Sequence, residues 1–383
     1  MFKILIVHTT RPGRSTGDRI RLEKTQELLQ RERFQVFSVK IPLSADRNEL
    51  FKAKYLEQLI EYSIPIHKWK FGLTISQKDL DYLLFNASLN YVRKIIRQLA
   101  PNVVLAQGTK AGWVASVASK EYKVPCIIDM HGLAFAEARG AGRKNWQGTL
   151  QQEFEAFRTC DYLVAVSKRM RDYVVQTMGI PNGKVVVAPN GSDLQISIAS
   201  YGTPIKIVYA GGFAYWEHVD DYLDVAKHAD GKRFAFYIAG DRSVGQALFE
   251  RIRKEHIPIT YLGYSQRPKI FDTLARMQVG IAPSTEDLAR QVACPVKVFD
   301  YMAVGLPVIT PRIGDWGDLI EDEDCGVALH NNNIEGYLSA LDKISGESDW
   351  ARKSKNARKI IRENYDWRTT LEPLLKVVRS YVE

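Results

Sequence analysis

The sequence has 383 residues, of which 45% are hydrophobic and 25% charged, and its formal net charge at pH 7 is +9. This composition is ordinary for a soluble globular protein, and the length predicts two domains. No apolar run reaches the ~18 residues of a membrane span, and the four cysteines are too scattered for a metal site or a disulfide framework.

The positive charge is concentrated in the first half of the chain. Residues 1–190 carry 29 basic and 17 acidic side chains, a net charge of +12, whereas the remainder has a net charge of −3. The first half is therefore expected to attract an anionic partner, such as a phosphorylated molecule or an acidic membrane surface. The alternative is that these charges only solvate helix faces.

Short apolar runs alternate with amphipathic stretches from the N-terminus onward, a pattern typical of parallel sheets covered by helices. The expected strands of the first half are Lys3 to His8, Gln35 to Ile41, Asn102 to Ala106, Pro125 to Met130, Tyr162 to Val166 and Lys184 to Ala188. The helices expected between them are Asp18 to Arg31, Asn90 to Leu99, Ala111 to Tyr122, Leu150 to Thr159 and Arg169 to Met178.

The pattern restarts after a linker rich in Gly, Ser and Pro, from Pro189 to Pro204. The strands expected here are Ile205 to Tyr209, Arg233 to Ala239, Ile259 to Leu262, Val279 to Ala282 and Pro307 to Thr310. The helices are His218 to His228, Val244 to Lys254, Pro268 to Met277 and Val296 to Val304, followed by two amphipathic helices from Asp349 onward. The chain thus predicts two Rossmann-like, doubly wound α/β domains, residues 1–190 and residues 191–365, that face each other across a cleft. A final helix, residues 366–383, is expected to pack back on the first domain.

The stretch CPVKVFDYMAVGLPVIT, from Cys294 to Thr310, places charge in an otherwise apolar or small sequence. On the predicted helix Lys297, Asp300 and Tyr301 share one face. A lysine in a first turn opposes the helix dipole unless an anion meets it, so this helix start is a candidate phosphate site with Asp300 accepting from sugar hydroxyls. A simple ion pair between Lys297 and Asp300 is the alternative.

The segment PVKVFDYMAVGLPVIT resembles a motif of the GT-B glycosyltransferases of family 4, which have two facing Rossmann-like domains. Further segments resemble the family in the expected order, namely KILIV, DMHG, DYLVAVSK, VVVAPNGSD, VYAGGF, FYIAGD and ITYLGY. The resemblance implies transfer of a sugar from a nucleotide-sugar donor, with retention at the anomeric carbon and without a metal or other cofactor.

The resemblance also implies roles for individual residues. Lys297 matches the basic residue that stabilises the diphosphate leaving group, Asp300 the acidic residue at the ribose, and His131 the histidine near the transferred sugar. These three are the predicted catalytic residues. The other residues expected to bind the donor are Gly17, Gly211, Gly212, Arg242, Gly263, Tyr264, Ser284, Thr285 and Glu286.

The sequence departs from the family in two places. Val292 stands where many members carry the first glutamate of a Glu-x7-Glu pair, and Glu286 or the amides of Ser284 and Thr285 are the expected substitutes. The arginine and lysine that bind the diphosphate after VYAGG are absent, with His218 or Arg242 as candidate replacements. A donor-binding protein with impaired catalysis is therefore the alternative function.

The partners expected are a nucleotide sugar and an anionic lipid-linked or saccharide acceptor, in cell-surface glycan synthesis. The basic first domain suggests peripheral contact with the inner face of a membrane, and the chain is expected to be cytoplasmic. A nucleic-acid partner is not expected, because no nucleic-acid motif is present. Epimerisation of a nucleotide sugar is another GT-B chemistry, but the motif order favours transfer.

Overall fold

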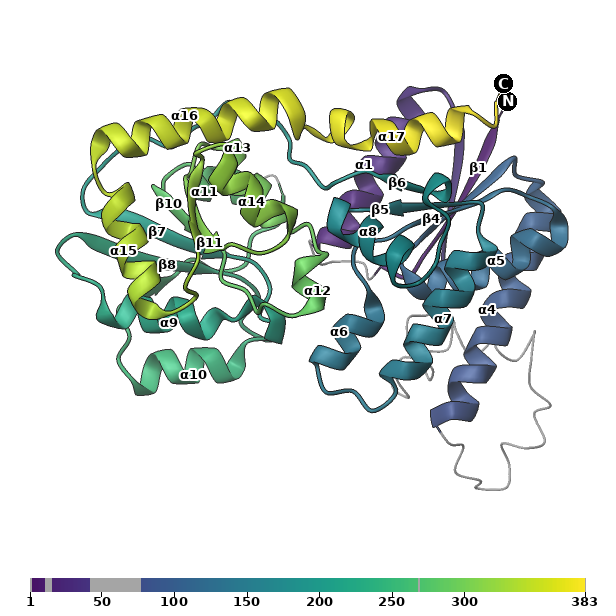
Figure 1. Cartoon of the computed structure of the whole chain (residues 1–383), viewed down its shortest axis with the longest axis horizontal. Helices are drawn as coiled ribbons and strands as arrows, with labels where there is room; N and C mark the ends of the chain where they lie inside the picture. The colour runs from purple at the N-terminus through teal and green to yellow at the C-terminus, as the bar shows by residue number, and fades with distance from the viewer. Residues whose placement is uncertain (1, 11–15, 42–76, 268, 383) are drawn as a thin grey trace.

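The computed structural model describes residues 2–10, 16–41, 77–267 and 269–382, and it places them in two α/β domains (Figure 1). Each domain holds a six-stranded parallel sheet. The strand orders are β2-β1-β3-β4-β5-β6 and β12-β11-β10-β7-β8-β9. In each sheet the later strands are added on both sides of the first one, β1 or β7, which is the topology of a doubly wound sheet. The predicted pair of doubly wound domains is therefore confirmed.

The first domain contains all six predicted strands, each within two residues of its expected ends. They are β1 (Lys3–His8), β2 (Gln35–Lys40), β3 (Val103–Gln107), β4 (Cys126–Asp129), β5 (Tyr162–Ala165) and β6 (Val185–Val187). Its helices are α1 (Gly17–Arg31), α4 (Gln77–Leu99), α5 (Thr109–Tyr122), α6 (Ala134–Gly140), α7 (Trp146–Thr159) and α8 (Lys168–Gln176). Helix α6 was not predicted, and α4 begins well before the expected Asn90.

The second domain repeats this architecture. Its strands are β7 (Ile205–Ala210), β8 (Phe234–Ala239), β9 (Ile259–Tyr261), β10 (Val279–Ile281), β11 (Val308–Pro311) and β12 (Gly326–Leu329). Its helices are α9 (Val219–His228), α10 (Gln246–Lys254), α11 (Lys269–Leu274), α12 (Leu288–Gln291), α13 (Val296–Ala303), α14 (Gly314–Asp322) and α15 (Ile334–Ile344). The sequence prediction missed β12, α12, α14 and α15.

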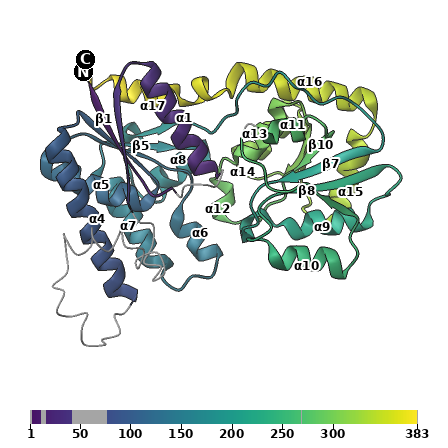
Figure 2. The same ribbon diagram turned by 180° about the vertical axis from the view of Figure 1, so that it is seen from behind.

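Two final helices run along both domains, as Figures 1 and 2 show from opposite sides. Helix α16 (Glu347–Asn364) contacts α13 and α15, whereas α17 (Trp367–Arg379) contacts α1 and β6. The apolar face of α17 is buried in one cluster with residues of the first sheet, for example Leu371 with Ile4. In the described parts of the chain, no helix is both long and apolar enough to span a bilayer.

A buried ion pair organises the centre of the first domain. Arg21 of α1 and Asp129 at the end of β4 have fully buried side chains, and Arg21 Nη2 lies 2.8 Å from Asp129 Oδ1. Arg21 Nη1 also donates to the carbonyl of Pro189 at 3.1 Å and to Asn190 Oδ1 at 3.2 Å. Asn190 Nδ2 in turn donates to the carbonyl of Cys294 at 2.6 Å. This chain of bonds ties α1 and β4 through the linker to the residues that precede α13.

Replacing Asp129 with asparagine should lower the free energy of unfolding by about 3–5 kcal/mol, because it leaves the Arg21 charge buried without its partner. Urea unfolding measures the loss. The matched control is Asp342→Asn, which breaks the exposed Arg233–Asp342 pair and should cost about 1 kcal/mol or less. Equal losses in the two variants would contradict the organising role of the buried pair.

Candidate active site

Elements of both domains meet in a region that we call the domain junction, where α6 contacts α12 (Figure 1). Gly17 at the start of α1 faces Val296 at the start of α13, because a Cβ on Gly17 would lie 3.4 Å from Val296 Cγ2. Gly140 at the end of α6 leaves room for Tyr215, whose hydroxyl donates to the carbonyl of Glu137 at 3.3 Å. The junction therefore brings the first turns of α1 and α13 to one place.

Lys297 lies in the first turn of α13 with its side chain only 12% exposed. Its ammonium group forms an ion pair with Glu217 and hydrogen-bonds the hydroxyl of Tyr209 at 3.0 Å. Burial lowers the pKa of Lys297, although Glu217 counteracts this. Burial alone would raise the pKa of Glu217, but Lys297 and Arg290 outweigh it and lower that pKa. The two side chains form a buried ion pair.

Asp300 lies one turn further along α13 and is also engaged. Its carboxylate accepts from Ser192 Oγ at 2.7 Å and forms an ion pair with Arg267. Burial raises the pKa of Asp300, while Arg267 and Ser192 oppose the rise. Because Lys297 and Asp300 have different partners, the Lys297–Asp300 ion pair considered from the sequence is not formed.

His131 follows β4 near the Arg21–Asp129 pair. The next residue, Gly132, lies against Glu137 of α6, because a Cβ on it would be 3.0 Å from Glu137 Oε1. Both ring nitrogens of His131 are buried, and neither has a hydrogen-bond partner among the described residues. Burial lowers the pKa of His131, although the nearby Asp129 partly offsets this. A neutral imidazole can donate from one nitrogen and accept at the other, so His131 is suited to bind a hydroxyl group.

The loop after β10 carries Ser284 and Thr285 and leads into α12. Ser284 Oγ accepts from Arg290 Nε at 2.9 Å, and the amide of Thr285 donates to the carbonyl of Trp216 at 3.1 Å. Thr285 Oγ1 is buried without a hydrogen-bond partner among the described residues. Glu286 is exposed on the same loop. The loop thus joins α12 to the turn that carries Glu217.

The glycines predicted to bind the donor lie at the carboxyl ends of neighbouring strands. A Cβ on Gly211, after β7, would lie 2.6 Å from Lys297 Nζ, so a larger residue there would have to displace the ammonium group. Gly212 accepts from the hydroxyl of Tyr209. After β9, Gly263 has a φ of +84° and its carbonyl accepts from the amide of Gly240 at 3.1 Å. These ends line one edge of the second sheet.

Two predicted donor residues lie at the surface of this edge. Arg242 is exposed and stacks over the ring of Phe249 at 5.3 Å. Tyr264 is 42% exposed. The structure therefore gathers Gly17, Gly211, Lys297 and the Ser284–Thr285 loop around the junction, whereas Arg242 and Tyr264 are exposed.

Sequence reasoning missed Glu217 and Arg290 as members of the site. Arg290 is buried, and its guanidinium lies 5.6 Å from the centroid of the Trp316 ring. It also influences the pKa of Glu217, Lys297 and Glu137, which belong to three separate segments. Its only signal in the sequence was a lone arginine in the polar loop before Cys294.

Helix α6 is held in place by a buried carboxylate of α7. Glu153 accepts from the amides of Ala134 at 2.7 Å and Phe135 at 3.1 Å, and from Thr109 Oγ1 at 2.7 Å. A carboxylate at a helix N-terminus satisfies amides that have no partner within the helix. Glu153 therefore fixes the helix that presents Glu137 to the junction.

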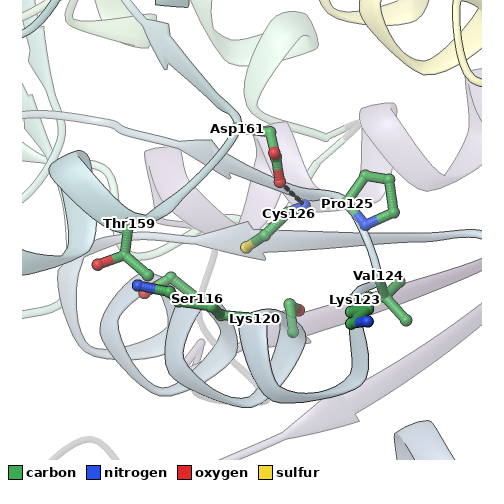
Figure 3. A pocket seen from close by; sticks show the side chains of 9 residues that line it. Ser116, Lys120, Lys123, Val124, Pro125, Cys126, Thr159 and Asp161 are labelled. Atoms are coloured by element: carbon green, nitrogen blue, oxygen red, sulfur yellow. Dashed lines mark hydrogen bonds between the residues drawn. The ribbon is translucent and has the colours of Figure 1, made fainter.

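A separate hollow of about 370 Å³ lies at the other end of β4 (Figure 3). Its lining includes Lys120, Lys123, Cys126 and Asp161, and Asp161 Oδ2 accepts from the amide of Cys126 at 2.7 Å. Because His131 follows the opposite end of β4, this hollow is not part of the junction. No group of three or more potential metal ligands occurs within the described ranges, and the metal-free reaction stays a prediction.

Comparisons with known proteins identify two family matches along the chain. Residues 53–196 match the model described as Glycosyltransferase Family 4, and residues 204–346 match the one described as Glycosyl transferases group 1. The first match includes residues outside the described ranges. Together the two matches cover most of both domains.

Curated relatives and a solved structure agree with these matches. A glycogen synthase of Mycobacterium tuberculosis is 23% identical over 71% of this chain and 67% of its own length. The UDP-Gal:alpha-D-GlcNAc-diphosphoundecaprenol alpha-1,3-galactosyltransferase of Escherichia coli is 21% identical over 71% of this chain and 73% of its own. The structure of Anabaena HepE in complex with UDP-glucose is similar in fold, with a TM-score of 0.72, 14% identity, and coverage of 99% of this chain and 100% of HepE.

The stability of the protein should depend on the ionisation of Glu153, because burial raises its pKa from 4.5 to about 7. A raised pKa means that the contribution of this group is fully present below pH about 4.5 and is lost as the pH rises through about 7. Relative to Glu153→Gln, the wild type should lose about 3 kcal/mol of unfolding free energy over that interval.

Denaturant unfolding of both proteins at several pH values measures this difference. Glu155→Gln, on the exposed side of the same helix, is the control and should follow the wild type. Parallel profiles for wild type and Glu153→Gln would show that Glu153 does not titrate in this range.

Proposed function

This chain belongs to the GT4-like glycosyltransferases of the GT-B fold, and we propose that it transfers a sugar from a nucleotide-sugar donor to a lipid-linked or saccharide acceptor. We further propose that the reaction retains the anomeric configuration and needs no metal. The donor would lie along the edge of the second sheet, with its diphosphate at the first turn of α13.

The observation that carries this proposal is the position of Lys297. A buried lysine in the first turn of a helix, with its ammonium group against the backbone of Gly211, favours an anion at that helix terminus. Breaking the bond from the anomeric carbon to the diphosphate leaves negative charge on the phosphate oxygens. Amide groups and cations that are already oriented toward this charge stabilise the transition state.

The acceptor hydroxyl would form the new bond on the face that the diphosphate leaves, and its proton would pass to a phosphate oxygen. His131 would hold a sugar hydroxyl in this arrangement through its unpartnered ring nitrogens. Asp300 would accept hydrogen bonds from the ribose hydroxyls once these replace Arg267 or Ser192 as partners of its carboxylate.

We assign the acceptor to the first domain, because that half of the chain has a net charge of +12. A phosphate-bearing lipid carrier would be attracted to it, and the printed name of the Escherichia coli relative describes transfer to a diphosphoundecaprenol-linked sugar. We also propose that the basic first domain contacts the cytoplasmic face of a membrane, and that the protein acts in cell-surface glycan synthesis.

A donor-binding protein with impaired catalysis is the second candidate. It is favoured by one contact, the ion pair in which Glu217 neutralises Lys297. A neutralised lysine offers less stabilisation to a leaving diphosphate. This candidate predicts nucleotide binding without sugar transfer.

Thermal unfolding with UDP, GDP, ADP, CMP and dTDP, each with and without its common sugars, tests the donor site. One nucleotide at ~100 times its dissociation constant should add ~2.7 kcal/mol to the free energy of unfolding. Lys297→Ala and Asp300→Ala should lose that response, whereas Lys343→Ala, at an exposed position of α15, should keep it.

Sugar transfer is tested next: lipid-linked saccharides are added to the protein with the donor that stabilises it, and the release of the free nucleotide (a nucleoside diphosphate, or CMP from a CMP-sugar) is measured. Release that depends on the acceptor supports the enzyme. Stabilisation by a nucleotide sugar without release from any acceptor would favour impaired catalysis. Equal nucleotide responses in wild type and Lys297→Ala would contradict the assignment of the phosphate to α13.

A further inference from the structure

We infer that Glu217 is an internal counter-ion that the donor diphosphate must displace from Lys297, and that it thereby sets the affinity for the donor. The inference rests on the proposed function, because it takes the first turn of α13 as the phosphate site. Beyond that function, the inference identifies a residue whose ion pair with Lys297 competes with the binding of the donor.

The ammonium group of Lys297 is already occupied on several sides. It is paired with Glu217, lies 3.0 Å from the hydroxyl of Tyr209, and sits 4.4 Å from the centroid of the same ring. The backbone at Gly211 closes another side. With the side chains of Lys297 and Glu217 only 12% and 11% exposed, a phosphate cannot pair with Lys297 while Glu217 keeps its place.

The turn that carries Glu217 is anchored, so its carboxylate stays close to the phosphate site. The carbonyl of Trp216 accepts from the amide of Thr285 at 3.1 Å and from Ser284 Oγ at 3.3 Å. His218 then adopts a left-handed conformation with a φ of 43°, and its Nδ1 lies 2.8 Å from Asp221 Oδ2. The carboxylate can therefore leave Lys297 by rotating its side chain, but the turn holds it nearby.

A third charged side chain, Arg290, adds to the effect of Glu217 on the affinity for a phosphate. Arg290 lies close enough to act electrostatically on both Lys297 and Glu217. With Glu217 ionised, these three side chains carry a net charge of +1. Without the carboxylate they would carry +2, and a diphosphate would no longer compete with Glu217 for Lys297. Since charges interact more strongly away from bulk water, the change in affinity should be large.

The test measures binding of UDP, GDP, ADP and dTDP, and of UDP-glucose, to the whole protein by titration calorimetry. Glu217→Gln keeps the size of the side chain and its hydrogen bond to Lys297 but removes its charge. It should bind the preferred nucleoside diphosphate about tenfold more tightly or better, which corresponds to about 1.4 kcal/mol. Adding Lys297→Met to this variant should abolish the gain.

Glu255→Gln is the matched control, because it breaks another lysine–glutamate pair, with Lys227, at the surface between α9 and α10. Its affinities should equal those of the wild type. If Glu217→Gln does not fold, Glu217→Asp withdraws the charge from Lys297 by one methylene and should show a smaller gain in the same direction.

The outcomes separate this inference from the proposed function. Binding to the wild type that is unchanged or weakened in Glu217→Gln would overturn the inference and leave the donor site intact. Weaker binding of UDP-glucose with unchanged binding of UDP would also overturn it, because Glu217 would then contact the sugar. No binding of any probe to wild type or variant would overturn the donor site itself, and the inference with it.

Discussion

The arrangement of the first domain and the linker depends on one buried cation, the guanidinium of Arg21, which needs partners for its hydrogen-bond donors. Arg21 lies in the interior of the first domain, where an unpaired guanidinium would be very costly, and Asp129 supplies the opposite charge. The remaining donors of Arg21 reach Pro189 and Asn190, so satisfying one charge also fixes the linker. Because Asn190 binds the carbonyl of Cys294, the same requirement sets where α13 begins relative to α1 and β4.

The candidate active site follows from that placement. Lys297 and Asp300 come to lie in a largely buried region, where charged groups must be paired, and the protein supplies the partners Glu217 and Arg267. Both pairs hold their side chains in fixed positions before a ligand arrives. Under the proposed function, the donor would have to replace Glu217 and Arg267 as the partners of these charges, and its affinity would be the difference between the two sets of contacts.

The local patterns of the sequence predicted much of this fold and little of its pairing. The apolar runs located eleven of the twelve described strands, and Pro295 with the Gly305 turn located α13. Strand β12 was missed because the segment GVAL is short and offers no period. Glu217 was missed because its partner is 80 positions away in sequence, and nothing in YWEHVD indicates a buried ion pair. The resemblance to the family predicted a donor region around Lys297 and Asp300, but it could not show that each of these side chains is already paired within the protein.

The most direct test of this account is a crystal structure of the wild-type protein with the nucleoside diphosphate that stabilises it most. We expect the diphosphate at the first turn of α13, with a phosphate oxygen bound to Lys297 Nζ and the Glu217 carboxylate rotated away from it. A diphosphate bound elsewhere, with the Lys297–Glu217 pair intact, would contradict both the location of the donor site and the role of Glu217.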